Sequence, residues 1–176
     1  MTVWTLRHPP VDRQGRCVGQ TVIETTISDA AAVQQAIETA PFRPVRLFSS
    51  DLPRCATLAH GLAKAWSVPV HTDPRLREMN FGDWEGRAYD AIDAEDGPRW
   101  RAWCADWQNS APPGGESLDA FVSRVSDWVD HHAPAPTDAI VTHAGVIRIF
   151  RVLSGSTWDE AMASENPFLG WIPHSL

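Results

Sequence analysis

The chain has 176 residues, of which 43% are hydrophobic and 21% are charged, and its formal net charge is −7. This length and composition predict a single globular domain over residues 1–176. The negative charge argues against general binding to nucleic acid or anionic membrane surfaces, and no apolar run approaches the roughly 20 residues of a membrane span. Three widely spaced cysteines disfavour a disulfide framework or a zinc site. We expect a cytoplasmic protein without a secretory signal.

Short apolar runs rich in β-branched residues predict the strands. These runs cover residues 2–6, 45–49, 68–71 and 138–142, and residues 168–172 are a candidate last strand. Helical spacing of apolar residues between the runs predicts helices. The alternation of strand and helix indicates an α/β fold around a mostly parallel sheet, whose ligand site lies outside the carboxyl ends of the strands.

Four helices follow from apolar spacing and capping signals. One spans roughly residues 29–39 behind Ser28, and a second begins after Ser50 or Asp51 with Pro53 in its first turn. The clearest pattern ends near residue 132, and a further helix opens at residue 145 and continues to residue 153.

The segment over residues 85–114 has a different composition from the rest of the chain. It is acidic and rich in tryptophan, and Gly97-Pro98 interrupts it. We predict that this segment is a small, partly helical insertion over the active site, with a break at Gly97-Pro98.

Charged side chains follow three of the predicted strands at the point where a ligand site is expected. Arg7 and His8 come directly after the first strand, Arg54 lies in the first turn after the second, and His143 directly follows the fourth. Two guanidiniums and two imidazoles at one sheet edge suit a phosphate dianion, to which arginine donates in a bidentate manner. A neutral histidine is one of the few side chains that attacks phosphorus, so His8 is a candidate nucleophile.

Five segments then resemble the histidine phosphatase superfamily, also called phosphoglycerate mutase-like. The chain is similar to its signatures, in order, at residues 6–9 (LRHP), 48–59 (FSSDLPRCATLA), 76–86 (LREMNFGDWEG), 115–117 (GES) and 141–145 (VTHAG). This resemblance implies a three-layer α/β/α fold.

The resemblance also implies a role for each matching residue. His8 would become phosphohistidine, and Arg7, Arg54 and His143 would bind the phosphoryl oxygens, with His143 also counted among the catalytic residues. Glu78 would protonate the leaving oxygen and then act as base toward water. The resemblance implies neither a metal nor another cofactor.

The first loop departs from the usual pattern of the superfamily. Pro9 stands where glycine is usual, and Gln14 stands where many members have a phosphate-binding asparagine. The Arg-His-Pro opening and residues 15–22 (GRCVGQTV) resemble the α-ribazole phosphatase branch, although Val18 and Val22 replace its tyrosine and aspartate. Gln14 and Gln20 are candidate substrate-binding residues.

Several functions remain open on the sequence alone. The leading hypothesis is a metal-independent phosphomonoesterase of a small metabolite, with α-ribazole 5′-phosphate as the first candidate substrate. A phosphoglycerate mutase, a phosphohistidine protein phosphatase and an inactive anion-binding module are the alternatives. Mutases of this type are usually longer, so the short insertion favours hydrolysis. The sequence leaves the oligomeric state open.

Overall fold

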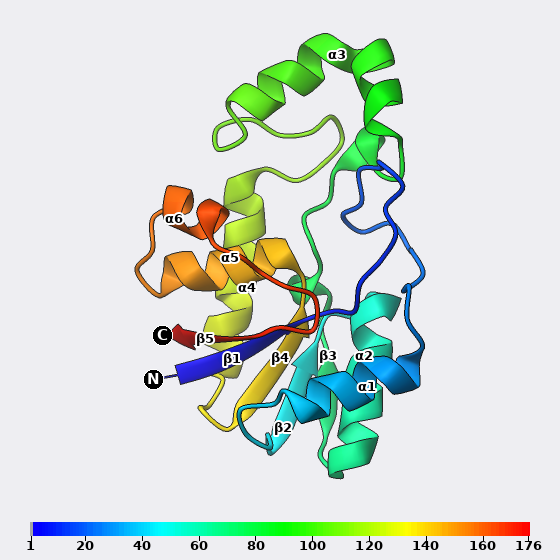
Figure 1. Ribbon diagram of the computed structural model, residues 1–176. Helices are drawn as coiled ribbons and strands as arrows, with labels where there is room; N and C mark the ends of the chain where they lie inside the picture. Colours follow the sequence, from blue (N-terminus) through cyan, green and yellow to red (C-terminus); the bar gives the residue numbers. More distant parts are fainter. Residues whose placement is uncertain (1) are drawn as a thin grey trace.

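The computed structural model describes residues 2–176 and has three layers, with helices on both faces of one sheet (Figure 1). The strand order is β3-β2-β4-β1-β5. The strands are β1 (Thr2–Arg7), β2 (Arg46–Ser49), β3 (Val70–Thr72), β4 (Asp138–Thr142) and β5 (Trp171–Ser175). Strands β1 to β4 pair in parallel, and β5 pairs antiparallel with β1. The predicted three-layer α/β/α fold with a mostly parallel sheet is confirmed.

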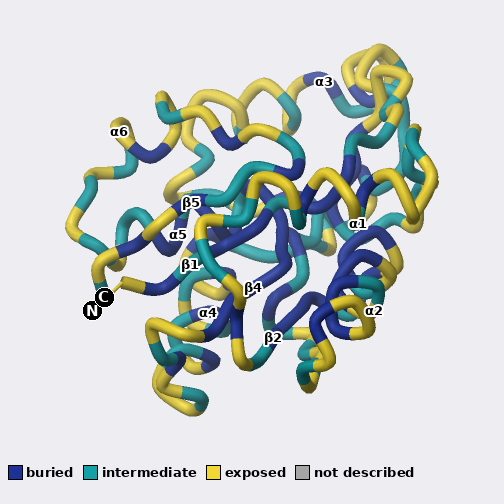
Figure 2. Tube along the Cα trace, turned by 60° about the horizontal axis from the view of Figure 1, so that its bottom comes forward, coloured by how far each residue is buried: buried dark blue, intermediate teal, exposed yellow. Residues whose placement is uncertain are grey.

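Alternating side chains along the strands supply both faces of the sheet. Leu47 packs with helices α1 (Asp29–Glu38) and α2 (Pro53–Trp66), whereas Phe48 packs with α4 (Leu118–His132) and α5 (Ala144–Leu153). Figure 2 shows the strands as a buried centre between partly exposed helices. Because both faces are covered, the carboxyl ends of the parallel strands are left as the place for a site.

Helix α3 (Tyr89–Ala105) lies apart from the sheet, beyond the carboxyl ends of the strands (Figure 1). It follows two short 3₁₀ turns, η1 (Pro74–Leu76) and η2 (Gly82–Trp84). The predicted break at Gly97-Pro98 is instead a kink inside the helix, with non-helical backbone angles at Asp96. Proline lacks the amide hydrogen and its ring clashes with the preceding turn, so it bends the helix without ending it.

The start of α2 differs from the expected side-chain cap. The N-cap is Leu52, which has no capping side chain, and Pro53 lies in the first turn as predicted. Ser50 Oγ accepts from the Leu52 N–H at 3.2 Å, and the Asp51 carboxylate pairs with Arg77 at 2.5 Å. Ser50 and Asp51, the two residues expected to cap the helix, therefore stabilise the loop between β2 and α2.

The C-terminal region contains two further differences. The last strand begins at Trp171, not at residue 168, and continues through Pro173 to Ser175. Helix α6 (Trp158–Ala163) was not predicted, although Thr157 and Glu160 form a capping box at its start. The T-x-x-E spacing was a readable signal for this helix.

Candidate active site

His8 is the first residue after β1, and its side chain is only 2% exposed. Its Nδ1 lies 2.7 Å from the carbonyl oxygen of Pro9. Because a carbonyl only accepts, Nδ1 carries the proton and Nε2 keeps its lone pair. Burial, together with the nearby Arg54 and Arg7 charges, lowers the pKa of His8 to about 3 against the opposing effect of the Pro9 contact. The imidazole is therefore neutral at neutral pH and suited to nucleophilic attack.

Pro9 replaces the glycine that is usual at this position of the superfamily. The contact that residue 9 makes with His8 uses its carbonyl oxygen, which proline retains. What proline lacks is the N–H. The substitution is thus compatible with the orientation of the His8 ring.

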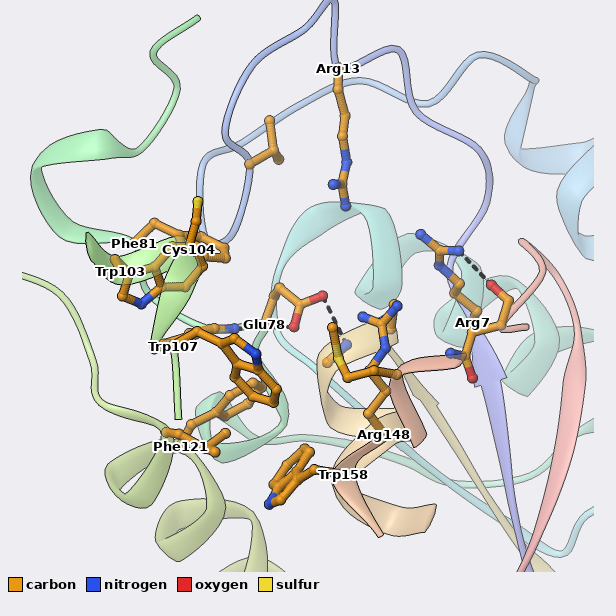
Figure 3. A pocket seen from close by; sticks show the side chains of 17 residues that line it. Arg7, Arg13, Glu78, Phe81, Trp103, Cys104, Trp107, Phe121, Arg148 and Trp158 are labelled. Carbon is orange, nitrogen blue, oxygen red and sulfur yellow. Dashed lines mark hydrogen bonds between the residues drawn. The ribbon is translucent and has the colours of Figure 1, made fainter. Parts of the chain in front are cut away.

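Arg7 ends β1 and points from the strand end into the cavity shown in Figure 3. Its Nη1 donates to the Asn166 carbonyl at 2.5 Å, and its guanidinium carbon lies 3.8 Å from the centroid of the Phe168 ring. Burial lowers the pKa of Arg7 to about 10, and neighbouring arginines add to this effect while Glu78 opposes it. The side chain therefore remains charged at neutral pH in a fixed orientation.

Arg54 and His143 contact each other beside His8. Arg54 Nε donates to His143 Nδ1 at 3.3 Å, so the His143 proton resides on Nε2, which lies 2.9 Å from Ser50 Oγ. Burial and the nearby His8 and Arg54 hold the pKa of His143 well below its usual range. The rings of His8 and His143 are 5.1 Å apart between centroids. The structure thus brings together the four residues that the strand ends predicted.

The loop over residues 17–21 covers Arg54. Arg54 donates through Nη1 to the Thr21 carbonyl at 3.0 Å and through Nη2 to the Gly19 carbonyl at 2.5 Å. The Glu85 carboxylate holds this loop, because it accepts from the backbone N–H groups of residues 19, 20 and 21. Glu85 is a structural residue that the sequence interpretation missed.

Glu78 lies on the cavity side of the site and is 7% exposed. Its Oε2 accepts from the Gly145 N–H at 3.2 Å, and its Oε1 accepts from the Met79 N–H at 3.2 Å. A Cβ at residue 145 would lie 2.1 Å from Oε1, so only glycine permits this approach. Glu78 therefore has a fixed carboxylate beside the start of α5.

A cavity of about 430 Å³ adjoins Arg7 and Glu78 (Figure 3). Most of the lining residues are apolar, and the aromatic ones come from the segment before α3, from α3 and its C-terminal end, and from α4 and α6. The aromatic lining residues are Phe81, Trp103, Trp107, Phe121 and Trp158. The charged lining residues Arg7, Arg13, Glu78 and Arg148 also face this space. This arrangement suits an anionic ester whose alcohol part carries an apolar or aromatic group.

The two glutamines proposed to bind substrate lie outside the lining of this cavity. Gln14 is exposed in the first loop, with φ at +48°. Gln20 donates from its amide to the Glu78 carbonyl at 3.1 Å and accepts from Arg77 at 3.4 Å. It therefore supports the Glu78 backbone, and contact of either glutamine with substrate stays a prediction.

Residues 2–176 contain neither a cluster of metal ligands nor a membrane-spanning helix. No group of three or more His, Cys, Asp or Glu side chains in these residues could hold a metal ion. Among the same residues, no helix combines the length and the apolar character needed to cross a membrane.

The family model of the histidine phosphatase superfamily (branch 1) matches residues 3–162. The chain belongs to this superfamily. It is 32% identical over 171 residues to the adenosylcobalamin/alpha-ribazole phosphatase of Salmonella typhimurium, covering 90% of this chain and 84% of that protein. It is also 32% identical over 158 residues to the glucosyl-3-phosphoglycerate phosphatase of Mycolicibacterium vanbaalenii, covering 81% and 68%.

A solved structure agrees with these sequence relatives. The alpha-ribazole phosphatase of Shigella flexneri superposes with a TM-score of 0.86 at 26% identity, covering 98% of this chain and 89% of that one. The enzyme class predicted from the resemblance is confirmed, and the protein is a histidine phosphatase.

Proposed function

We propose that this histidine phosphatase hydrolyses α-ribazole 5′-phosphate through a phosphohistidine intermediate. The observation that carries the proposal is the aromatic cavity beside Arg7 and Glu78, which suits an ester whose alcohol carries a heteroaromatic base. The similarity to alpha-ribazole phosphatases supports the same substrate.

The first chemical step transfers the phosphoryl group to His8. Its Nε2 lone pair attacks phosphorus and the bond to the alcohol oxygen breaks, while Glu78 gives a proton to that oxygen. The product is phosphohistidine and a free alcohol. The neutral state of His8 makes the lone pair available at neutral pH.

Phosphoryl oxygens bind Arg7 and Arg54 during this step, and His143 joins them by moving its Nε2–H donation from Ser50 Oγ to a phosphoryl oxygen. The Arg54 guanidinium exchanges its contacts with the carbonyls of Gly19 and Thr21 for phosphoryl oxygens, so the covering loop shifts when substrate binds. These donors stabilise the negative charge on the phosphoryl oxygens in the transition state, which is the work a metal does in other phosphatases.

The second step releases inorganic phosphate. Glu78, now ionised, takes a proton from water as the water oxygen attacks phosphorus, and the bond from phosphorus to His8 Nε2 breaks. The histidine and the protonated Glu78 are then restored.

We also propose that residues 1–176 form one domain and that residues 85–114 are an insertion that covers the site. We propose a cytoplasmic location for the protein.

Steady-state kinetics test the substrate directly. We expect a higher kcat/KM for α-ribazole 5′-phosphate than for 3-phosphoglycerate, measured with and without a chelator, and we expect no loss in the chelator. Efficient interconversion of phosphoglycerates with little release of phosphate would contradict the proposal and would identify the protein as a phosphoglycerate mutase. Inactivation by chelator that one divalent ion restores would overturn the metal-free mechanism.

A further inference from the structure

The arginines of this acidic protein divide into two groups. Within residues 2–176, seven arginines form ion pairs with carboxylates, and all seven lie outside the lining of the cavity. The paired arginines are Arg46, Arg75, Arg77, Arg87, Arg99, Arg101 and Arg124. In the same part of the chain, seven arginines have no such ion pair: Arg7, Arg13, Arg16, Arg43, Arg54, Arg148 and Arg151. Three of these, Arg16, Arg43 and Arg151, lie outside the lining of the cavity and donate to main-chain carbonyls. Arg7 and Arg54 have a partner in the phosphoryl group, so Arg13 and Arg148 are the unpaired arginines of the cavity lining that remain.

Arg148 lies one helical turn after Ala144 and Gly145, on the face of α5 that lines the cavity. Figure 3 shows its guanidinium pointing toward Glu78 and Arg7. Its Nε is buried without a hydrogen-bond partner. A buried donor of this kind is costly unless a ligand satisfies it, so the position indicates a binding role.

Arg13 reaches the same cavity from the loop between β1 and α1, on the opposite side in Figure 3. No carboxylate of the described residues forms an ion pair with it. The charges of Arg13 and Arg148 both contribute to the lowered pKa of Arg7. The positive charges of Arg13 and Arg148 therefore lie close enough to Arg7 to repel its charge.

The charges of the site do not balance with a phosphoryl group alone. A phosphate dianion offsets Arg7 and Arg54, and Glu78 is the one carboxylate among the described residues that line the cavity. When Glu78 carries the proton needed by the leaving oxygen, the charges of Arg13 and Arg148 remain without an anion.

We propose that Arg148, with Arg13 across the cavity, forms a second anion subsite that binds a carboxylate on the alcohol part of the substrate. The planar guanidinium of Arg148 matches the two oxygens of a carboxylate. The subsite extends the substrate range from neutral alcohols to acidic phosphomonoesters. It requires that substrate occupies this cavity, and it does not depend on α-ribazole 5′-phosphate being the preferred ester.

Two esters that differ in one group test the subsite. 3-Phosphoglycerate carries a carboxylate where glycerol 3-phosphate carries a hydroxymethyl group. Each is measured as a competitive inhibitor of p-nitrophenyl phosphate hydrolysis, which reports binding even if neither ester is turned over. In the wild type we expect 3-phosphoglycerate to bind roughly 10-fold more tightly or better, the usual range for a charged hydrogen bond.

Variants assign this preference to Arg148. Arg148→Met should remove most of the preference for 3-phosphoglycerate over glycerol 3-phosphate, and Arg148→Lys should retain part of it. Arg101→Met is the control, because it removes a surface arginine and changes the net charge by the same amount. Inorganic phosphate, measured as a third inhibitor, reports the phosphoryl site separately. Equal inhibition of the wild type by the two esters would overturn the subsite. An equal loss of affinity for both esters and phosphate in Arg148→Met would overturn it too, because Arg148 would then act on the phosphoryl group or the fold.

Discussion

The phosphoryl side of the site and the cavity beside it are built in different ways. On the phosphoryl side, His8 and His143 directly follow parallel strands, and Arg54 lies in the first turn of a helix after another strand. The cavity wall instead comes mainly from loops and from the helices α3, α4, α5 and α6. Strand ends therefore supply a compact set of groups for phosphoryl transfer, while loops and helices form the wall against which the alcohol part would fit.

Among the variants that distinguish the two regions, we expect the largest loss of rate for Glu78→Gln. Glu78 lies between the phosphoryl side of the site and the cavity. Glu78→Gln keeps the size of the side chain but cannot donate a proton to the leaving oxygen. Phosphoenzyme formation from a sugar phosphate should fall by about 10²–10⁴-fold, the usual range for general acid catalysis. The loss should be clearly smaller with p-nitrophenyl phosphate, because nitrophenolate leaves without a proton.

Burst kinetics measure this step apart from dephosphorylation, in which Glu78 is the proposed base. Equal losses with both substrates in the phosphorylation step would mean that Glu78 only organises the site through its contact with Gly145.

On the phosphoryl side, Arg54→Ala should weaken the binding of vanadate or inorganic phosphate. A charged hydrogen bond is worth about 1.5–3 kcal/mol, which corresponds to a loss of roughly 10- to 100-fold in affinity. Titration calorimetry with vanadate measures this loss, and Arg101→Met is again the matched surface control. Unchanged affinity would remove Arg54 from the phosphoryl site.

A buried histidine outside both regions provides a comparison of stability. His174 lies in β5, with Nε2 2.9 Å from Thr5 Oγ1, and burial lowers its pKa to about 3. The unfolded chain binds this proton near pH 6.5 and the folded chain does not, so the stabilising contribution is lost as the pH falls from 6.5 toward 3.

His174→Gln should reduce the loss of unfolding free energy between pH 7 and pH 5 by about 2 kcal/mol. Urea unfolding of both proteins at the two pH values measures this difference. An identical pH dependence in the two proteins would show that His174 carries no acid penalty.

The smallest effect is expected on the cavity side. Trp107 lines the cavity and makes an edge-to-face contact with Trp158, with ring centroids 5.6 Å apart. Trp107→Ala should raise KM for α-ribazole 5′-phosphate by about 2- to 10-fold, as expected for the loss of an aromatic contact worth about 0.5–1.5 kcal/mol. KM for glycerol 3-phosphate, which lacks a ring, should change less. A parallel rise for both esters would contradict the assignment of this wall to the aromatic base.

The same division explains how much of the site the sequence could predict. Arg7, His8 and His143 follow strands that the apolar runs make recognisable, and β4 has the bounds expected from its sequence. Glu78 lies in an irregular stretch between η1 and η2, so its role follows only from the resemblance to a family. Arg13 lies in a long loop whose path depends on tertiary contacts, and no local pattern predicts where it points.

Two other features carried a partial signal. Arg148 lies four residues after Ala144, so helical spacing alone places both on one face. The candidate last strand was predicted over residues 168–172, so Pro173 lay outside it. The strand continues because β5 is an edge strand of the sheet, where a missing N–H is tolerated. Strand position within a sheet is a property of the whole fold and is not encoded locally.

The most direct test of the mechanism is a rapid-quench experiment with α-ribazole 5′-phosphate on the wild type and His8→Ala. We expect an acid-labile phosphoenzyme in the wild type, located on His8 by mass spectrometry. In the variant we expect loss of this species together with a fall in kcat of roughly 10⁴-fold or more. Normal turnover by His8→Ala, or a phosphoenzyme located on another residue, would contradict this mechanism.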